Sequence, residues 1–473
     1  MNRSRLPLDE FFHRLRSLWL PLLVAALLRF ALMFFAFTHT GTQVMTQGDT
    51  ASYLVPGHNL VMNNEFTSAG LPEIDRTPAY PLFAELTGMA WSNVLSTISI
   101  QILVSLASLV LIRTIANRIF PNTRAGIIAA WLFACEPLSI LCTSRVMPET
   151  LFLFFLLLTI ERILAYQATE NLAAVASAGA FLAAATYTRP VSYYLGLFLA
   201  IGLAATSPGR RGLRWKAPAI LLLTVAPSLA IWQWRNATEA GYSGFSSIVE
   251  KNLYFFQSAE VSAELQHISF GAQQQKLGYP EDRYYAAAHP EQLFWTQSQK
   301  QRFMRTEALA VIKDHPVLYL KTHVIGVAIV AFTPCATELL QLIDAYPNGD
   351  VMPHRILSLG IPASIMRTMI ADPAAAAIMA VLETFLLFQY IFTIRGCIRA
   401  YALPSRPQML TLVGIAMYFL LISGGAQAVG RYRAPVMPAL CVLAAGGLVS
   451  SRKKETAEPL KLRSQDEEIY VKS

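Results

Sequence analysis

The sequence of 473 residues is poor in charge and in cysteine. Only 14% of its residues are charged, against roughly 25% in an ordinary soluble domain. Its five cysteines all lie in or beside apolar segments, without paired spacing in the long hydrophilic segment. The sequence therefore implies neither a disulfide framework nor a thiolate metal site.

Several common motifs are also missing. The sequence has no Walker motif, no G-x-G-x-x-G and no stretch that alternates basic and aromatic residues. Its histidines do not show the H-x-x-x-H spacing of a metal site. A cytosolic nucleotide-using enzyme is disfavoured, and we expect no nucleic-acid partner.

Apolar residues make up 54% of the chain. Long stretches without a single charged residue occupy 94–112, 217–234, 409–430 and 434–450. They approach the roughly 20 residues that cross a bilayer, where only a helix satisfies its own backbone. The first apolar stretch, 18–37, is too long for a signal peptide and more spans follow it. We therefore predict an all-α polytopic protein surrounded by membrane lipids.

The net charge of +8 is distributed as short basic clusters beside the apolar stretches. These clusters are Arg113, Arg118 and Arg124; Arg210, Arg211, Arg214 and Lys216; Arg395, Arg399 and Arg406; and Arg452, Lys453 and Lys454. Such clusters are typical of cytoplasmic segments. The pattern predicts a multi-pass protein of the cytoplasmic (inner) membrane, with both termini inside and with 39–93 and 235–317 facing outward.

The apolar segments predict a bundle of about 10 to 12 spans. Candidate spans are 18–37, 94–112, 125–145, 147–165, 172–188, 191–206, 217–234, 324–337, 374–394, 409–429 and 434–450. Two cytoplasmic termini require an even number of crossings, whereas these candidates number eleven. Segment 324–337 therefore either dips into the membrane without crossing it or returns through 351–370. The predicted parts are a tail 1–17, a module 18–234, a loop or small domain 235–317, a membrane region 318–450 and a tail 451–473.

The outward loop 39–93 holds the first candidate site residue. We expect surface helices at 49–62 and 78–91, and Asp49 stands at the start of the first, one turn before Tyr53. A sheltered carboxylate there could take a proton from an acceptor hydroxyl. Asp is equally a common helix N-cap, and spacing alone favours the cap.

Further ionisable residues lie near the outward ends of the spans. Glu73, Asp75 and Arg76 follow one another closely, and an acid beside a cation either positions a phosphate or makes a solvated turn. Glu149 follows Pro148 and either lines a cavity or caps its helix. Arg29 and Glu136 lie at span depth, where charge is costly and suggests function.

Arginines also occur at the outward ends, in YTRPVSYY (Arg189) and in GRYRAPVMP (Arg431, Tyr432 and Arg433). Guanidinium groups suit bidentate contact with phosphate. Anchoring to anionic lipids is the competing explanation, but anchoring residues are normally found on the cytoplasmic side. We therefore favour ligand binding.

Taken in order, Asp49, RTPAYPLFAEL, PETLFLF, TRP, HPVLYL and RYRAPVMP resemble motifs of the GT-C superfamily of membrane glycosyltransferases. Within that superfamily the motifs resemble the branch of dolichyl-phosphate-mannose protein mannosyltransferases and the lipid A aminoarabinose transferase. The resemblance implies that Asp49 is the catalytic carboxylate and that Asp75 and Arg76 lie near the carrier phosphate. It also implies a second acid at Glu149 and a phosphate contact at Arg189. Many relatives have another acid where this chain has Thr50.

The resemblance implies transfer of a sugar from a polyprenyl-phosphate carrier to a hydroxyl of a lipid, a polysaccharide or a protein. We expect Asp49 to act as base, with Arg76, Arg189, Arg431 and Arg433 at the donor phosphate and Tyr53, Asp75, Glu149 and Tyr432 lining the cavity. The sequence identifies no definite cofactor, and a divalent metal ion is compatible with the pattern. The alternatives are a flippase of lipid-linked sugars and, third, a structural scaffold.

Overall fold

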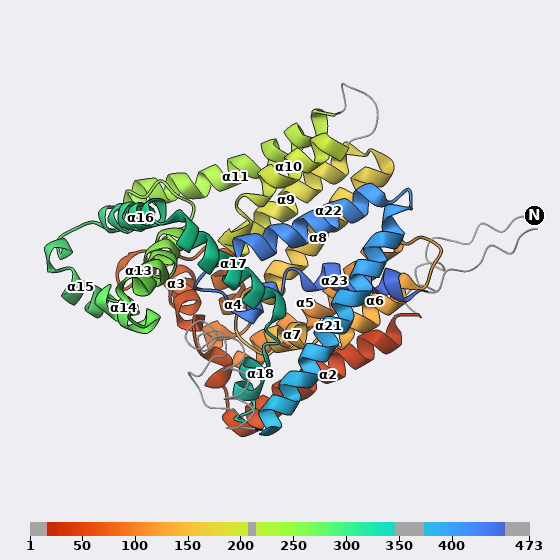
Figure 1. Cartoon of the computed structure of the whole chain (residues 1–473), viewed down its shortest axis with the longest axis horizontal. Helices are drawn as coiled ribbons and strands as arrows, with labels where there is room; N and C mark the ends of the chain where they lie inside the picture. Colours follow the sequence, from red (N-terminus) through yellow and green to blue (C-terminus); the bar gives the residue numbers. More distant parts are fainter. Residues whose placement is uncertain (1–16, 207–213, 346–372, 450–473) are drawn as a thin grey trace, which may run out of the picture.

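The structure, a computed structural model, describes residues 17–206, 214–345 and 373–449. The predicted all-α class is confirmed, because the described residues are almost entirely helical (Figure 1). The strands described are β1 (Thr67–Ser68) and β2 (Leu71–Pro72), which pair antiparallel within the first loop. The predicted return through 351–370 and both tails lie outside the described residues, apart from Ser17 at the end of the first tail.

Most of the predicted apolar segments coincide with helices, but 324–337 covers the end of α17 (Pro316–Phe332) and the start of α18 (Ala336–Leu342). Among the described residues, five helices are long and apolar enough to cross a membrane: α2 (Trp19–Thr40), α5 (Val94–Ile119), α8 (Glu149–Thr169), α11 (Lys216–Ala240) and α21 (Pro373–Tyr401). Four are shorter: α9 (Leu172–Thr188), α10 (Leu195–Thr206), α22 (Arg406–Ile422) and α23 (Met437–Leu448). Two bent pairs raise the number of long spans to seven if each pair is one span.

The remaining helices lie in the connections. The loop after α2 contains η1 (Val44–Thr46), α3 (Thr50–Asn63), α4 (Ala79–Thr87) and η2 (Met89–Trp91). The segment after α11 contains α12 (Ile248–Asn252), the π-helix η4 (Leu253–Ser258), α13 (Ala259–Gln266), α14 (Phe270–Lys276), α15 (Asp282–Ala288), η5 (Pro290–Gln292) and α16 (Gln297–Asp314). Also present are η3 (Pro190–Ser192), α17 (Pro316–Phe332), α18 (Ala336–Leu342) and η6 (Gly430–Arg433).

The segment 125–145, predicted as one span, is broken into α6 (Ala125–Ala134) and α7 (Pro137–Thr143), which meet at 55°. Proline starts α7, and the Glu136 carboxylate caps it by accepting from the amides of Leu138 and Ser139. The end of α6 is closed by Arg29, which donates to the carbonyls of Phe133 and Ala134 at 3.3 and 3.1 Å. Arg29 and Glu136 therefore stabilise the break between α6 and α7. Their presence at span depth is no longer a reason to infer a bound ligand.

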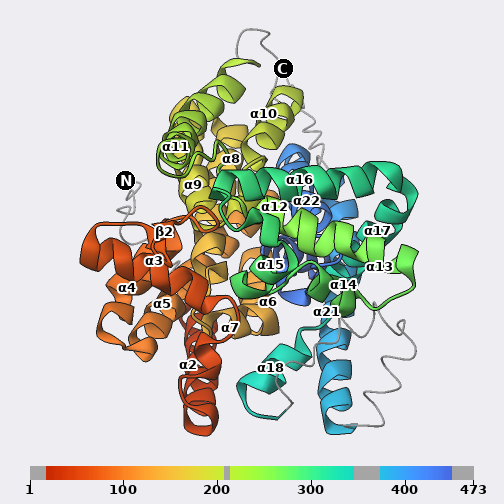
Figure 2. The same ribbon diagram turned by 90° about the vertical axis from the view of Figure 1, so that its left-hand side faces the viewer.

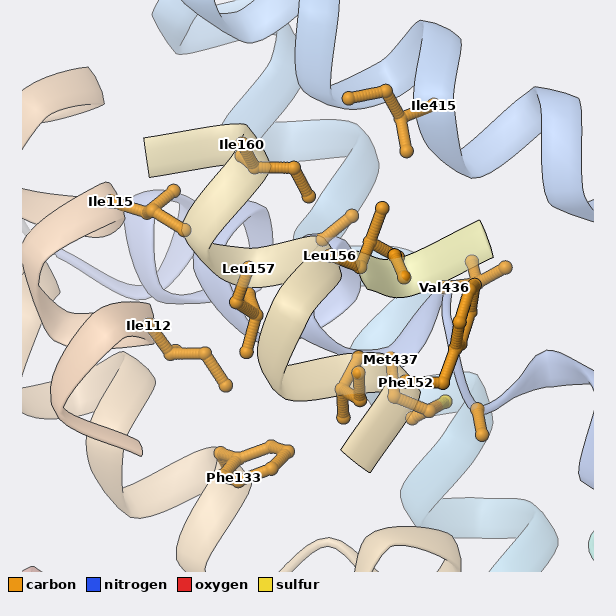
Figure 3. Packing of buried hydrophobic residues seen from close by; sticks show 14 of the residues in the cluster. Ile112, Ile115, Phe133, Phe152, Leu156, Leu157, Ile160, Ile415, Val436 and Met437 are labelled. Atoms are coloured by element: carbon orange, nitrogen blue, oxygen red, sulfur yellow. The ribbon is translucent and has the colours of Figure 1, made fainter. Parts of the chain in front are cut away.

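The hydrophobic core lies where α5, α6, α8, α22 and α23 meet (Figure 3). Ile112, Phe133, Leu157 and Met437 are among its buried side chains. Phe152 of α8 meets Phe419 of α22 edge to face, with ring centroids 5.8 Å apart. Without lipid between them, these helices hold the ends that carry the candidate site in fixed relative positions.

Helices α21 and α23 approach each other closely through glycine. A Cβ atom on Gly396 would lie 1.8 Å from the carbonyl oxygen of Leu443, and one on Gly447 would lie 2.1 Å from that of Phe392. Small residues allow this backbone contact between membrane helices. The helix that follows Arg433 is thereby locked to its neighbour.

The helices α12 to α16 gather at one end of the molecule, beside α3 (Figures 1 and 2). Figure 2 looks directly onto this end, with α3 and α4 to one side and the green helices α12 to α16 in front. A second core of aromatic residues, including Tyr254, Phe255 and Tyr285, holds this layer together. The segment predicted as an outward loop or small domain is therefore an ordered helical layer.

Candidate active site

Asp49 stands at the N-cap position of α3, as its spacing predicts, but its carboxylate makes no capping hydrogen bond. Oδ2 instead accepts from Nη2 of Arg431 at 2.8 Å, and Oδ1 lies 3.6 Å from Nη2 of Arg76. The side chain is 45% exposed. The cap interpretation is therefore wrong for the side chain, which is shared between two arginines.

Arg76 comes from the loop between β2 and α4. Its Nε donates to Ser52 Oγ at 2.9 Å, its Nη1 donates to the Tyr53 hydroxyl at 3.1 Å, and its guanidinium lies 4.4 Å from the centre of the Tyr53 ring. Glu73 tightens the same turn, because its Oε1 accepts from the amides of Asp75 and Arg76. The guanidinium is thus oriented by α3 and by its own turn.

Arg431, Tyr432 and Arg433 form η6, between α22 and α23. The Tyr432 ring lies near two guanidinium groups, with centroid distances of 5.7 Å to Arg431 and 5.8 Å to Arg189. Arg433 is buried and donates through Nη1 to the carbonyls of Val330, Ala331 and Thr333. It thus closes the end of α17, and we leave it out of the proposed phosphate site.

Arg189 and Glu149 form a buried pair beside these residues. Nη1 of Arg189, at the end of α9, lies 3.1 Å from Oε1 of Glu149, whose side chain is 3% exposed. A cavity of about 20 Å³ is lined by Glu149, Arg431, Arg145 and Glu338, among others. Such a volume is enough for one water molecule.

Charge in the site favours an ionised Asp49. Partial desolvation would raise the pKa of this carboxyl, but Arg431 and Arg76, with a smaller contribution from Arg189, hold the pKa below its ordinary value of 3.8. The site therefore holds two carboxylates, those of Asp49 and Glu149, among three guanidinium groups. This is an excess of positive charge suited to an anionic ligand.

Asp75 lies beside Arg76 but faces the helical layer. Its carboxylate accepts from the Ser247 hydroxyl and pairs with Nζ of Lys251 at 2.5 Å. Its main-chain carbonyl accepts from the Ser246 hydroxyl. Asp75 therefore joins the first loop to α12 and to the two serines that precede it.

The residues of the helical layer that reach the site were not identified from the sequence. Lys251 contacts Asp75, and Gln257 contacts the loop that leads to Arg431. Both lie in the string Lys251 to Ser258, KNLYFFQS, which resembles a protease tag imperfectly and is taken as native. No spacing signal in the sequence links them to residues more than 150 positions away.

No metal cluster is evident in the described ranges: no group of three or more His, Cys, Asp or Glu side chains is placed to hold an ion. Asp49 and Glu149 are the carboxylates of the predicted set that lie among the arginines. Among the predicted site residues, Arg76 and Arg431 contact Asp49 directly. Tyr53 contacts Arg76, the Tyr432 ring lies near Arg431 and Arg189, and Glu149 pairs with Arg189. Their roles remain predictions.

Three solved structures of the Archaeoglobus fulgidus oligosaccharyltransferase are similar to this chain. One is the apo form, with a TM-score of 0.48, 14% identity, 91% of this chain and 50% of that chain covered. A second is AglB in complex with an inhibitory peptide and a dolichol-phosphate. Its TM-score is 0.48 and its identity 12%, with 93% of this chain and 50% of that chain covered. A third is tethered by a disulfide to an acceptor peptide with the NVT sequon. Its TM-score is 0.48 and its identity 13%, with 92% of this chain and 49% of that chain covered. This chain thus spans about half the length of these proteins, and so slight a likeness implies nothing about activity.

No curated protein matches the chain. Residues 75–234 match the family of dolichyl-phosphate-mannose-protein mannosyltransferases. The matched segment contains Arg76, Glu149 and Arg189, whereas Asp49 and Arg431 lie outside it. With this match, the resemblance of the chain to the GT-C superfamily of membrane glycosyltransferases is confirmed.

Proposed function

We propose that this protein transfers a sugar from a polyprenyl-phosphate carrier to an acceptor hydroxyl on the outer face of the cytoplasmic membrane, with Asp49 as base. The family match supports glycosyl transfer from a lipid-linked donor. One observation carries the rest of the proposal: the Asp49 carboxylate lies between the guanidinium groups of Arg76 and Arg431. A proton acceptor and a phosphate-binding pair therefore adjoin each other.

The arginines suit the donor phosphate. A phosphodiester oxygen can accept from Nη2 of Arg431 and Nη2 of Arg76, which both approach Asp49. The Tyr432 ring lies 5.7 Å from the guanidinium of Arg431 and 5.8 Å from that of Arg189, so Arg189 adds a further positive charge near Arg431. Guanidinium groups at the leaving phosphate stabilise the charge that grows there in the transition state.

The step is an inverting displacement. The acceptor oxygen forms a bond to the anomeric carbon while the bond from that carbon to the phosphate oxygen breaks, and its electron pair stays on the phosphate. The acceptor proton passes to Asp49 and later to water. The products are the glycosylated acceptor and the polyprenyl phosphate.

Donor binding also prepares the base. A carboxylate whose pKa is held low is a weak base. When the donor phosphate binds Arg76 and Arg431, these arginines lower the pKa of Asp49 less than before. The phosphate also brings a negative charge close to Asp49. Both changes raise the pKa of Asp49. The base therefore becomes effective when the donor is in place.

A panel of polyprenyl-phosphate sugars, incubated with the purified protein and candidate acceptor lipids, polysaccharides and peptides, tests the proposal. We expect one donor to be consumed with release of polyprenyl phosphate, and the release to be lost in Asp49→Asn. A flippase would instead move the intact donor across a vesicle membrane without releasing polyprenyl phosphate. That result with every donor and acceptor would overturn the proposal. Parallel reactions with and without a chelator determine whether a divalent ion takes part.

A further inference from the structure

One continuous helical run touches both arginine-bearing arms of the site. The run comprises α12, η4 and α13, and the residues at its junctions, Asn252, Leu253, Ser258 and Ala259, keep helical φ and ψ angles. The first arm is the turn that carries Arg76, and the second is the loop 423–429 that leads to Arg431. The run lies outside the segment matched by the family.

The start of the run holds the first arm. The Ser247 hydroxyl and Nζ of Lys251 both bind the carboxylate of Asp75, the residue before Arg76. The Ser247 amide also donates to the carbonyl of Ile74 at 2.9 Å. Backbone and side-chain contacts thus attach this turn to the run.

Gln257, in the π-helix, holds the second arm. Its Nε2 donates to Oε1 of Gln427 at 2.5 Å and to the carbonyl of Gly424 at 3.3 Å. Gly425, at φ +95°, allows this approach, since a Cβ there would lie 2.1 Å from Nε2 of Gln257. A single π turn inside an α-helix is a feature often found at functional sites.

We propose that residues 247–257 act as a brace that sets the separation of Arg76 and Arg431 around Asp49, and that Lys251 and Gln257 are positioning residues for the donor phosphate. This inference rests on the proposed function. Ten residues of helix extend about 15 Å, and a helix is stiff over that length. The brace therefore fixes two groups that belong to distant parts of the chain.

The kinetic test uses Lys251→Met, Gln257→Leu and the double variant in the purified full-length protein. Each single change should raise the donor KM about tenfold with little change in kcat. A tenfold rise corresponds to the loss of one hydrogen bond to a charged or buried group. Because releasing either end frees the brace, the double variant should raise KM no more than the stronger single one. Multiplying effects would overturn the brace and leave two independent contacts.

Two further variants sharpen this test. Lys251→Arg keeps the charge at Asp75 and should restore the donor KM, whereas a general packing defect would remain. Gly425→Ala pushes on Gln257 from the opposite side and should reproduce Gln257→Leu. Lys321→Met is the matched control, since it removes an exposed pair of similar type with Glu264 and should leave KM unchanged. An equal rise in KM with this control would overturn the proposal.

Hydrogen exchange separates the brace from the proposed function. Gln257→Leu should speed amide exchange in residues 424–431 and leave 73–77 protected, and Lys251→Met should do the reverse. These shifts are expected even if no donor in the panel is turned over. Unchanged exchange in both segments would overturn the brace while transfer by the unaltered protein still stood.

Discussion

Nη2 of Arg431 lies 2.8 Å from Oδ2 of Asp49, although 382 positions separate the two residues in the chain. The contact joins the start of α3 to the short turn η6, which precedes α23. It places a carboxylate and a guanidinium group side by side. The predictions for the site depend on which of the two partners the donor displaces.

Asp49→Asn separates binding from chemistry. Loss of the base should lower kcat/KM by about 100-fold or more. The affinity for polyprenyl phosphate should rise, because the competing negative charge at Arg76 and Arg431 is gone. Turnover and binding of polyprenyl phosphate to the purified protein measure the two effects. Asp314→Asn, an exposed change at the end of α16, should alter neither, and substantial turnover by Asp49→Asn would remove Asp49 from the mechanism.

Arg76→Lys tests the geometry of the phosphate site. Lysine keeps the charge but loses the planar fork that contacts Ser52 and Tyr53 and that suits a phosphate. We expect the donor KM to rise about tenfold while the acceptor KM stays the same. Steady-state kinetics with each substrate varied separately provide the measurement. An unchanged donor dependence, matching that of the exposed control Arg302→Lys, would assign Arg76 to structure alone.

Arg29→Met should act on stability. The change leaves two helix-end carbonyls, those of Phe133 and Ala134, without their donor in a buried place. A loss of about 2 to 5 kcal/mol is expected. Thermal unfolding in detergent measures the loss, and Arg283→Met on α15, which is 70% exposed, is the control. An unaltered midpoint would mean that the break between α6 and α7 is held by other contacts.

The pair Asp75 and Lys251 predicts a pH window. Desolvation would raise the pKa of Asp75, but Lys251 lowers it below 3.8; burial would lower the pKa of Lys251, but Asp75 raises it above 10.5. The stabilisation from Asp75 is therefore complete above pH 3.8 and is lost as the pH falls through its folded pKa. That from Lys251 is complete below pH 10.5 and is lost as the pH rises through its folded pKa.

Comparison with Lys251→Met measures this window. The unfolding midpoint of the unaltered protein should exceed that of the variant by a few degrees at pH 5 to 9. The difference should shrink as the pH falls below 3.8 and as it rises above 10.5. A difference that stays constant across the whole range would show that packing of the lysine stem, and not the ion pair, stabilises the contact.

Much of the fold could be predicted because each span carries its own signal. Runs of apolar residues near the length of the bilayer identify α2, α5 and α11 without knowledge of their neighbours. The break between α6 and α7 was missed, although Pro137 was a local sign of it. The local rule of helix capping also predicted the place of Asp49 but not the direction of its carboxylate.

The site was harder to predict because its geometry is made by distant contacts. The spacing around Asp49 favours a cap, whereas Arg431, 382 positions away, and Arg76 draw the carboxylate away from that role. Arg433 has the same residue type and the same neighbourhood in sequence as Arg431, yet it closes α17. Lys251 and Gln257 carry no motif at all. A sequence read along its length cannot distinguish such partners.

The glycines at the contact of α21 and α23 affect where a lipid carrier would have to bind. With Gly396 and Gly447 in backbone contact, α23 cannot slide along its neighbour, and the depth at which η6 offers Arg431 is fixed. Under the proposed function, the carrier has to bring its phosphate to that level, and its tail remains among the lipids beyond. A site of this kind measures depth rather than tail length, so carriers that differ in their number of isoprene units should be used alike.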